Sequence, residues 1–312
     1  MNSPEYGFLV IDKPEGLTSH DVVVCVRRLM KLRRVGHLGT LDPLATGVLP
    51  LAFGRATRLI QFLKEGAKVY LGTIQLGHST STYDREGEPT SIGTTPCFSQ
   101  TQLDEICSEM LGEHWQAPPP FSAKKVRGVR AYQLARQGKT PELDAQKVWI
   151  RKLQLQKLSP ELIHLEIHCS AGTYVRSVAH DIGKRLGCGA YLASLRRLVS
   201  GEFGLERAVS LETLRSQGVT VIMDRMIPIS QVLNELPELT VGNETARAFA
   251  HGRDLVIESS DLGGERGSLV RIFSERRDLL GLAEVQALIS NIPHERVMEL
   301  HLHPRVVLER IG

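Results

Sequence analysis

The chain has little cysteine and lacks the short motifs of several common protein classes. Its five cysteines among 312 residues are scattered, odd in number and form no CxxC pair. That pattern argues against a disulfide framework or a zinc knuckle and favours a reducing compartment. The sequence also contains no Walker A motif and no GxGxxG motif, which disfavours nucleotide hydrolysis and dinucleotide binding.

Long apolar segments are missing as well. The longest runs, such as residues 48–53, are far shorter than a membrane span. The N-terminal MNSPEYGFLV has no basic region followed by a long apolar one, so no secretory signal is visible. We therefore expect a cytoplasmic protein without a membrane partner.

Charge is unevenly distributed, although the net charge is only +3. Residues 1–234 carry 29 Lys/Arg and 22 Asp/Glu, a net charge of +7, whereas residues 235–312 carry 9 and 13, a net charge of −4. A basic front portion fits a polyanionic partner, with an ordinary solvated surface as the alternative. Within it, residues 27–34 and 124–139 carry basic residues and no acids, so both stretches could bind phosphates.

The hydrophobic pattern predicts many strands and few helices. A first helix should begin after Thr18, an N-cap candidate that Asp21 would complete as a short capping box. Further helices are expected at 103–111 and 174–186, and strands at 8–11, 68–76 and 162–169. This mixture favours an α+β fold over a regular βαβ winding.

A domain boundary is expected near residues 234–236. After it the lysines vanish and short strands dominate the pattern. Asn243 is expected to cap a short helix that ends at Gly252. The predicted domains are therefore residues 1–234 and 235–312.

The densest candidate site is the loop of residues 36–47, GHLGTLDPLATG. Its three glycines let the backbone bend and a ligand approach closely. Pro43 biases Asp42 towards an extended backbone, which holds the carboxylate stiffly. A rigid carboxylate near the imidazole of His37 suits acid–base or nucleophilic chemistry, and a plain Asp-Pro turn is the alternative.

Two other side chains fit such a site. Tyr70 lies on the expected strand 68–76 and could stack on a nucleobase, or it could belong to the core. Arg176 lies near the start of a predicted helix, where the helix dipole disfavours a cation. An acidic partner such as Asp42 would compensate, and the cation would keep that carboxylate ionised; a surface arginine is the alternative.

The segments in this order resemble one family closely, the bacterial tRNA pseudouridine-55 synthases of the TruB family. The matching segments span most of residues 8–200, and it is their ordered series that makes the match specific. They are DKPEGLTS at 12–19, the loop 36–47, KVY at 68–70, LGHSTSTYDREG at 76–87, QAPPPFSAKK at 116–125, GTYVR at 172–176 and LASLRR at 192–197.

The resemblance implies a role for each matching residue. It makes Asp42 the catalytic aspartate and Tyr70 the ring that stacks on the target base. Arg176 would pair with Asp42, with Asp84 in the same network. Lys13 and Pro14 would buttress the site, and His37 would contact the substrate strand near the target. Leu195 would form an apolar wall beside the base. The RNA backbone would be held by Lys124, Lys125, Arg127 and Arg130.

The same resemblance implies the fold and the partners. It predicts a pseudouridine-synthase fold, with a mixed, largely antiparallel sheet flanked by helices and a mobile RNA-gripping element around residues 120–140. The segments FAHGRDL at 249–255, LLGLAEV at 279–285 and LHPRVVL at 302–308 resemble, more loosely, a PUA domain, a small RNA-binding β-barrel. The expected partner is the T-arm stem-loop of tRNA, bound by a monomer without an obligatory protein partner.

The implied reaction is the isomerisation of uridine 55 to pseudouridine. The base leaves C1′, rotates and rejoins through C5, so no redox cofactor, nucleotide or metal is required. The target base would have to be flipped out of its folded loop. A carboxylate would act as a nucleophile or remove a sugar proton, and the sequence leaves open attack at C1′, attack at C6 and a glycal route.

Three other functions remain as alternatives. One is an RNA-binding protein or RNA chaperone without catalysis, and another is a pseudouridine synthase that works in a guide-RNA complex. The latter usually carries longer basic tails, whereas Met1 and Gly312 lie close to the predicted domains. The third is a metal-dependent nuclease that uses His164, Glu166 and His168, although this alternating trio is better interpreted as a solvated strand face.

Overall fold

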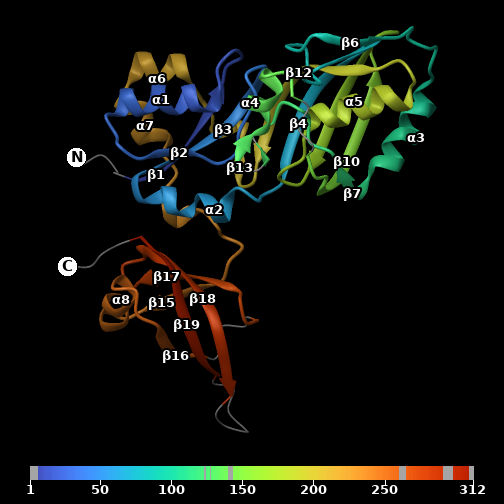
Figure 1. Cartoon of the computed structure of the whole chain (residues 1–312). Coiled ribbons are helices and arrows are strands. Elements are labelled where there is room, and N and C mark those ends of the chain that lie inside the picture. The colour runs from blue at the N-terminus through green and yellow to red at the C-terminus, as the bar shows by residue number, and fades with distance from the viewer. Residues whose placement is uncertain are drawn as a thin grey trace.

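The chain forms two units, each built on its own sheet. The computed structural model describes residues 6–122, 124–126, 128–139, 143–259, 265–290 and 298–308. In Figure 1 helices pack over one face of the larger sheet, and the C-terminal unit lies beneath it, beside the short helix α2 (Ile60–Leu63). Within these ranges no helix is both long and apolar enough to cross a membrane.

The larger sheet is mixed and largely antiparallel, as the family resemblance implies. Among the described residues it has ten strands, and its path runs β14–β1–β3–β12–β4–β11–β10–β7, with β13 beside β12 and β2 beside β3. Only the β1–β14 and β3–β12 pairs are parallel within this part of the chain. The strands of this unit are β1 (Gly7–Lys13), β2 (Val35–His37), β3 (Ala45–Phe53), β4 (Lys68–Leu76), β5 (His78–Thr80), β6 (Pro89–Ile92), β7 (Gly112–Gln116), β8 (Lys125–Val126), β9 (Val129–Arg130), β10 (Gln146–Lys157), β11 (Leu162–Cys169), β12 (Ala190–Ser200), β13 (Phe203–Gly204) and β14 (Val209–Ser210).

The first helix forms where the capping pattern predicts it. Thr18 Oγ1 accepts a hydrogen bond from the Asp21 amide at 3.1 Å, and the Asp21 carboxylate accepts one from the Thr18 amide at 2.9 Å. Val22 and Val26 are fully buried against the sheet. Besides α2, the helices of this unit are α1 (Ser19–Met30), α3 (Gln100–Met110), α4 (Ala131–Arg136), α5 (Val175–Arg185), α6 (Leu211–Gln217) and α7 (Val219–Arg225), with the 3₁₀ turns η1 (Gly54–Leu59), η2 (Leu205–Arg207) and η3 (Ile229–Gln231).

Strand alternation gives the larger sheet two different faces. On β4, Tyr70 and Ile74 point into the main core, which α1, α3, α5 and α6 cover. Leu71 and Thr73 alternate with them and lie on the opposite face. The inner face therefore carries the helices, and among the described residues none of them covers the part of the outer face around Thr73.

The C-terminal unit is a five-stranded sheet, among the described residues, with one helix. Its strand order is β15–β17–β18–β19–β16. The PUA-like assignment of this sheet stays a prediction. The elements are β15 (Glu238–Val241), α8 (Asn243–Ala250), β16 (Leu255–Ser259), β17 (Leu269–Ser274), β18 (Leu279–Ser290) and β19 (Met298–Val307).

The predicted cap of the C-terminal helix was wrong by one residue. Gly242 is the N-cap of α8, and it makes no side-chain capping bond. Asn243 is already the first helical residue, and its side-chain amide donates to Glu275 Oε2 at 3.4 Å. The side chain therefore bonds to the neighbouring loop and does not close the helix.

The two units share a hydrophobic core. Phe8 and Val10 of β1 belong to the same buried cluster as Phe273 of β17, Leu282 of β18 and Val306 of β19. An Arg58 guanidinium nitrogen in η1 also donates to the carbonyl of Val307. This continuous burial fixes the C-terminal unit against the outer side of β1 and β3.

We expect the two units to unfold together because they share this core. Leu282→Ala should lower the free energy of unfolding by about 2–5 kcal/mol and move the whole transition to lower temperature. Scanning calorimetry measures this, with Val256→Ala, an exposed position on β16, as a control expected to change stability by less than about 0.5 kcal/mol. A separate early transition of the C-terminal unit would contradict the shared core.

Candidate active site

Asp42 lies beside a buried arginine that comes from a distant part of the chain. Arg176 Nε is 2.9 Å from Asp42 Oδ2, an ion pair that lacks hydrogen-bond geometry. The Arg176 side chain is 7% exposed, whereas the Asp42 side chain is 36% exposed. The cation is therefore held inside the protein, and the carboxylate reaches out from it towards solvent.

A second carboxylate holds the other end of the same guanidinium. Arg176 Nη1 lies 3.3 Å from Asp84 Oδ2, and Asp84 is almost fully buried. Arg176 also donates to the carbonyl of Thr82 from Nη1 and to that of Phe121 from Nη2, both at 3.0 Å. The predicted network of Asp42, Arg176 and Asp84 is thus present as a set of contacts in the structure.

The position of Asp84 is fixed by its own turn. Its Oδ1 accepts hydrogen bonds from Thr82 Oγ1 at 2.6 Å and from the Glu86 amide at 3.0 Å. Its backbone bridges to Leu192 of β12. Because β3 also pairs with β12, Asp42 and Asp84 approach Arg176 from segments that flank the same central strand.

Lys13 buttresses the Asp42 loop from the end of β1. Its Nζ donates to the carbonyls of Pro14 at 2.8 Å, Leu17 at 2.6 Å and Pro43 at 3.2 Å. Burial lowers the pKa of Lys13 to about 8, and the nearby charge of Asp42 opposes that shift. The ammonium group therefore stays mainly protonated at neutral pH while tying two loops together.

Two further residues hold this loop, and neither was predicted to have a role. Ser19 Oγ accepts from the Leu41 amide at 2.8 Å and donates to the Leu41 carbonyl at 3.1 Å. Arg197, only 1% exposed, donates to the carbonyls of Val48 at 2.7 Å and Gly39 at 3.2 Å. Alternation along β12 places Arg197 on the same buried face as Leu195, a signal that exists only once this strand and its neighbours are known.

Tyr70 and Leu195 lie on the inner face next to this arginine. Tyr70 is 7% exposed, and burial raises the pKa of its hydroxyl, with the Arg197 guanidinium opposing the shift. Leu195 is buried on β12 opposite Gly72 of β4, the second residue after Tyr70. Both predicted base contacts are therefore close to the loop that carries Asp42, but neither has a large exposed surface.

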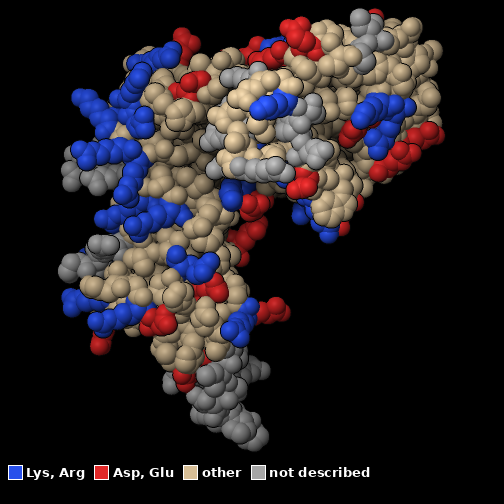
Figure 2. All heavy atoms as spheres, in the orientation of Figure 1, with Lys and Arg blue, Asp and Glu red and all other residues tan. Residues whose placement is uncertain are grey.

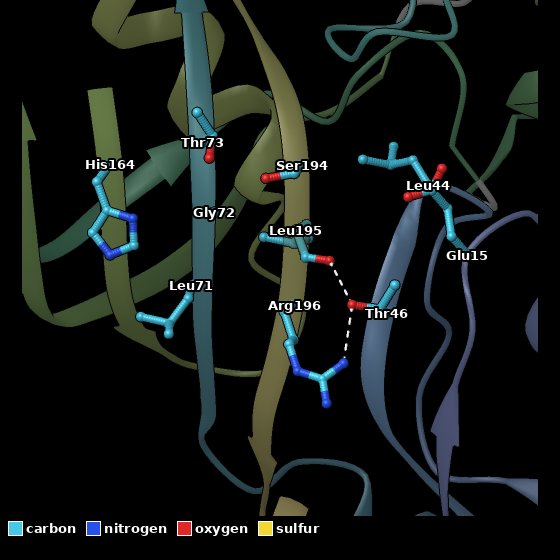
Figure 3. Close-up of a pocket in the computed structure, with 10 residues that line it drawn as sticks. All are labelled: Glu15, Leu44, Thr46, Leu71, Gly72, Thr73, His164, Ser194, Leu195 and Arg196. Carbon is cyan, nitrogen blue, oxygen red and sulfur yellow. Dashed lines mark hydrogen bonds between the residues drawn. The ribbon is translucent and has the colours of Figure 1, made fainter. Parts of the chain in front are cut away.

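A hollow of about 250 Å³ lies beside the Asp42 loop (Figure 3). Leu71 and Thr73 of β4 and His164 of β11 form one side, and Glu15 and Leu44 face them from the loops at the ends of β1 and β3. Between them Thr46 Oγ1 donates to the Leu195 carbonyl at 3.4 Å. Neither Asp42 nor Arg176 lines this hollow, although it borders the start of β3.

The structure does not join every predicted residue to Asp42. His37 lies on β2, and no interaction between it and Asp42 is found within the described part of the chain. Burial lowers the pKa of His37. Lys124 is half-buried, whereas Arg127 and the side chains of Lys125 and Arg130 lie outside the described residues.

Two members of the alternating trio on β11, Glu166 and His168, make charged contacts on the outer face, whereas His164 lines the hollow. Glu166 Oε1 lies 2.7 Å from Lys152 Nζ and 2.8 Å from His168 Nε2. Among the residues that the structure describes, no group of three His, Cys, Asp or Glu is arranged to hold a metal ion. This arrangement fits the interpretation of these residues as a polar strand face.

Lysine and arginine side chains gather along one flank of the molecule, over α1 and α2 and on to the C-terminal unit beside α8 (Figure 2). We call the exposed arginines of α1, of the segment that follows it, of η1 and of α8 the basic flank. The C-terminal unit contributes to it despite its net negative charge. Its members are Arg27, Arg28, Arg33, Arg34, Arg55, Arg58 and Arg247.

Family models match most of the chain, residues 27–289 apart from a short gap at 234–236, in three pieces. Residues 27–175 match the model described as TruB family pseudouridylate synthase (N terminal domain). Residues 176–233 match the tRNA pseudouridylate synthase B C-terminal domain, and residues 237–289 match the model Pseudouridine synthase II TruB, C-terminal.

Curated relatives are similar over most of their length. The tRNA pseudouridine synthase B of Solibacter usitatus (strain Ellin6076) is 46% identical over 94% of this chain and 99% of that protein. The protein of the same name from Synechococcus sp. (strain CC9311) is 40% identical over 100% of both chains. That of Aquifex aeolicus (strain VF5) is 39% identical over 90% of this chain and 96% of that one.

Solved structures share the fold. A chain in the crystal structure of a Cbf5-Nop10-Gar1 complex has a TM-score of 0.73 at 25% identity, covering 98% of this chain and 86% of that one. A chain in the structure of an H/ACA RNP bound to a substrate RNA containing 2'-deoxyuridine has a TM-score of 0.72 at 23% identity, covering 99% and 92%. The second likeness speaks for the fold alone.

The loop that carries Asp42 should not tolerate a side chain at Gly47. Gly47 has φ +96°, and a Cβ there would lie 2.2 Å from the Arg197 carbonyl oxygen. Gly47→Ala should therefore cost at least about 2 kcal/mol of unfolding free energy, measured by denaturant unfolding. Gly187→Ala is the matched control, because Gly187 has φ +75° with open space around it and carries only the backbone cost of about 1 kcal/mol. Equal losses in the two variants would contradict the close contact.

Proposed function

The chain belongs to the TruB family of pseudouridylate synthases, and we propose that it converts uridine 55 in the T-arm of tRNA to pseudouridine with Asp42 as the essential carboxylate. It is an isomerase that acts on tRNA, as its relatives' names and its family domains indicate. The position in the tRNA and the roles of individual residues are part of the proposal. The network of Asp42, Arg176 and Asp84 is the observation that carries it.

The network suits a reaction that breaks and remakes a bond at the sugar. Asp42 presents a half-exposed carboxylate to which no hydrogen bond is made by the described residues, so its oxygens are free to meet a substrate. Arg176 attracts that carboxylate from the buried side and thereby fixes its direction. A carboxylate held in this way can attack C1′ or C6, or remove a sugar proton on a glycal route, and all three routes remain open.

The target base would occupy the space between the Asp42 loop and β12. Extruding a base from a folded RNA loop costs a few kcal/mol, and stacking on Tyr70 would return about 1–3 kcal/mol. Leu195 would form an apolar wall that keeps water from the detached base. Because Tyr70 and Leu195 are largely covered in this structure, we infer that the site opens when RNA binds.

One end of the segment 120–140 is linked to the network. The carbonyl of Phe121 accepts a hydrogen bond from Arg176 Nη2 at 3.0 Å. Residues 120–140 are the proposed RNA-gripping element. Its movement would therefore act directly on the Arg176 guanidinium.

The basic flank is the proposed track for the tRNA backbone outside the active site. It runs from α1 across η1 to α8, so it joins the proposed catalytic domain, residues 1–234, to the proposed RNA-binding domain, residues 235–312 (Figure 2). Phosphate contacts of this kind give affinity without reading sequence. We further propose a cytoplasmic monomer that needs no protein partner.

The proposal predicts that Asp42→Asn abolishes isomerisation while tRNA binding survives. The amide keeps the shape of the side chain but removes the charge, so the rate should fall by roughly 10²–10⁴-fold or more. Tritium release from tRNA labelled at uridine C5 measures the rate, and filter binding measures affinity. Asp224→Asn, an exposed carboxylate on α7, is the matched control and should leave both unchanged. Near-normal tritium release by the Asp42→Asn variant would contradict the assignment of Asp42 as the essential carboxylate. If the chain were a non-catalytic RNA-binding protein, the parent itself would release no tritium.

The proposal also predicts which charges set the salt dependence of binding. Changing Lys124, Lys125 and Arg127 together to glutamine should weaken tRNA binding and reduce the slope of log K against log salt by about 1 for each phosphate that is no longer neutralised. The matched control changes Lys147 and Arg151 to glutamine, two exposed cations on β10. If both variants keep the parent's slope, the segment 120–140 does not hold the RNA backbone.

A further inference from the structure

A tyrosine and a histidine stack face to face behind the network. The ring centroids of Tyr83 and His180 are 3.8 Å apart, and the two planes differ by 8°. The predicted roles assign nothing to either residue. Their stack is the closest and most parallel aromatic contact within the described part of the chain.

The stack connects the two elements that hold Arg176. Tyr83 lies between Thr82 and Asp84, whose carbonyl and carboxylate both contact the Arg176 guanidinium. His180 lies four residues after Arg176 on α5, so the two side chains share one face of that helix. The turn of residues 82–84 is therefore attached to α5 at two points, one polar at Arg176 and one aromatic at His180.

The backbone at Tyr83 needs this second attachment. Tyr83 has φ +63°, a left-handed conformation that a bulky side chain rarely adopts. The turn around it is closed by hydrogen bonds from the Tyr83 amide to Thr80 O at 3.2 Å and from the Leu192 amide to Tyr83 O at 3.0 Å. Strained residues of this kind persist where the surrounding contacts over-determine them, and they gather at functional sites.

His180 is suited to stacking and to little else in its surroundings. Its Nδ1 is buried and has no hydrogen-bond partner among the described residues. Burial, with a smaller effect from Lys184, lowers the pKa of His180 to about 4, so the ring is neutral at physiological pH. A neutral, flat ring can lie against the tyrosine without the cost of burying a charge.

We propose that Tyr83 and His180 form an aromatic clamp that positions Arg176, and through it Asp42, for the reaction. This inference rests on the proposed function of the network. Without the clamp, the turn keeps its backbone bonds to Thr80 and Leu192 but loses its packing against α5, so Asp84 is held less firmly against the Arg176 guanidinium. Tyr83 and His180 are positioning residues, because neither touches Asp42 in the structure.

The test compares variants that remove the stack with variants that preserve it. Tyr83→Ala and His180→Ala should each lower the single-turnover rate of isomerisation at least about tenfold, because displacing a reacting group by an ångström can reduce a rate by that factor or more. The Kd for tRNA should change less than about twofold. Tyr83→Phe and His180→Phe keep a flat ring and should retain the rate. The double variant should lose no more than the larger single loss, since both changes remove the same interaction.

Two controls separate positioning from stability. Tyr83→Gly removes the ring and also relieves the left-handed backbone, so it should stay as heat-stable as the parent and still be slow. Tyr191→Ala removes the other tyrosine–histidine pair, with His78, whose centroids are 4.8 Å apart at 46°, and should leave the rate unchanged. Suppose that the parent protein isomerises uridine and that the Asp42→Asn variant does not. Unchanged rates in Tyr83→Gly and His180→Ala would then overturn the clamp and leave the proposed function intact. A parent without isomerisation would instead overturn the proposed function.

Discussion

The contact between Arg176 and Asp42 is the constraint on which the candidate site depends. Two acidic side chains and two backbone carbonyls surround one buried guanidinium. Burying an arginine costs free energy unless acceptors bind its N–H donors. Removing one acidic partner would leave an uncompensated buried charge. Asp42, Asp84 and Arg176 come from the loop before β3, the turn after β5 and the start of α5, so the contact joins three segments that the sheet brings together.

The remaining parts of the site limit how far Asp42 can move. Lys13 and Arg197 are buried cations that bond to backbone carbonyls of the 36–48 segment and not to carboxylates. Gly47 lets that segment pass close to the Arg197 backbone, where no side chain fits. The protein thus stiffens the loop with fixed donors and leaves the carboxylate of Asp42 partly exposed. The shared core of the two units extends this rigidity to the C-terminal sheet.

Much of the fold and the main polar network could be predicted from the sequence. The strand 68–76 and the capping box of Thr18 and Asp21 are local patterns, and both form as expected. Asp42, Arg176 and Asp84 were predicted as a group only through the resemblance to a family, because no local pattern brings residues so distant together. The cap of α8 was misplaced because Asn243 bonds to a neighbouring loop instead of its own helix.

Other features depend on tertiary contacts that a single sequence does not encode locally. Arg197 looks like an ordinary basic residue until the strand order of β3, β12 and β4 places carbonyls around it. The left-handed backbone of Tyr83 and its stack with His180 likewise arise only when α5 packs behind the turn of residues 82–84. The shared core between the units was not predicted either. Alternation along a strand shows that its apolar residues are buried, but it does not show that two sheets bury them against each other.

The central claim is that this site isomerises one uridine of tRNA. Incubation of the protein with unmodified tRNA, followed by mapping of pseudouridine at single-nucleotide resolution, tests it most directly. The account predicts stoichiometric pseudouridine at position 55 of the T-loop and at no other uridine of that tRNA. Pseudouridine at a different position, or none at all with folded protein and intact tRNA, would contradict it.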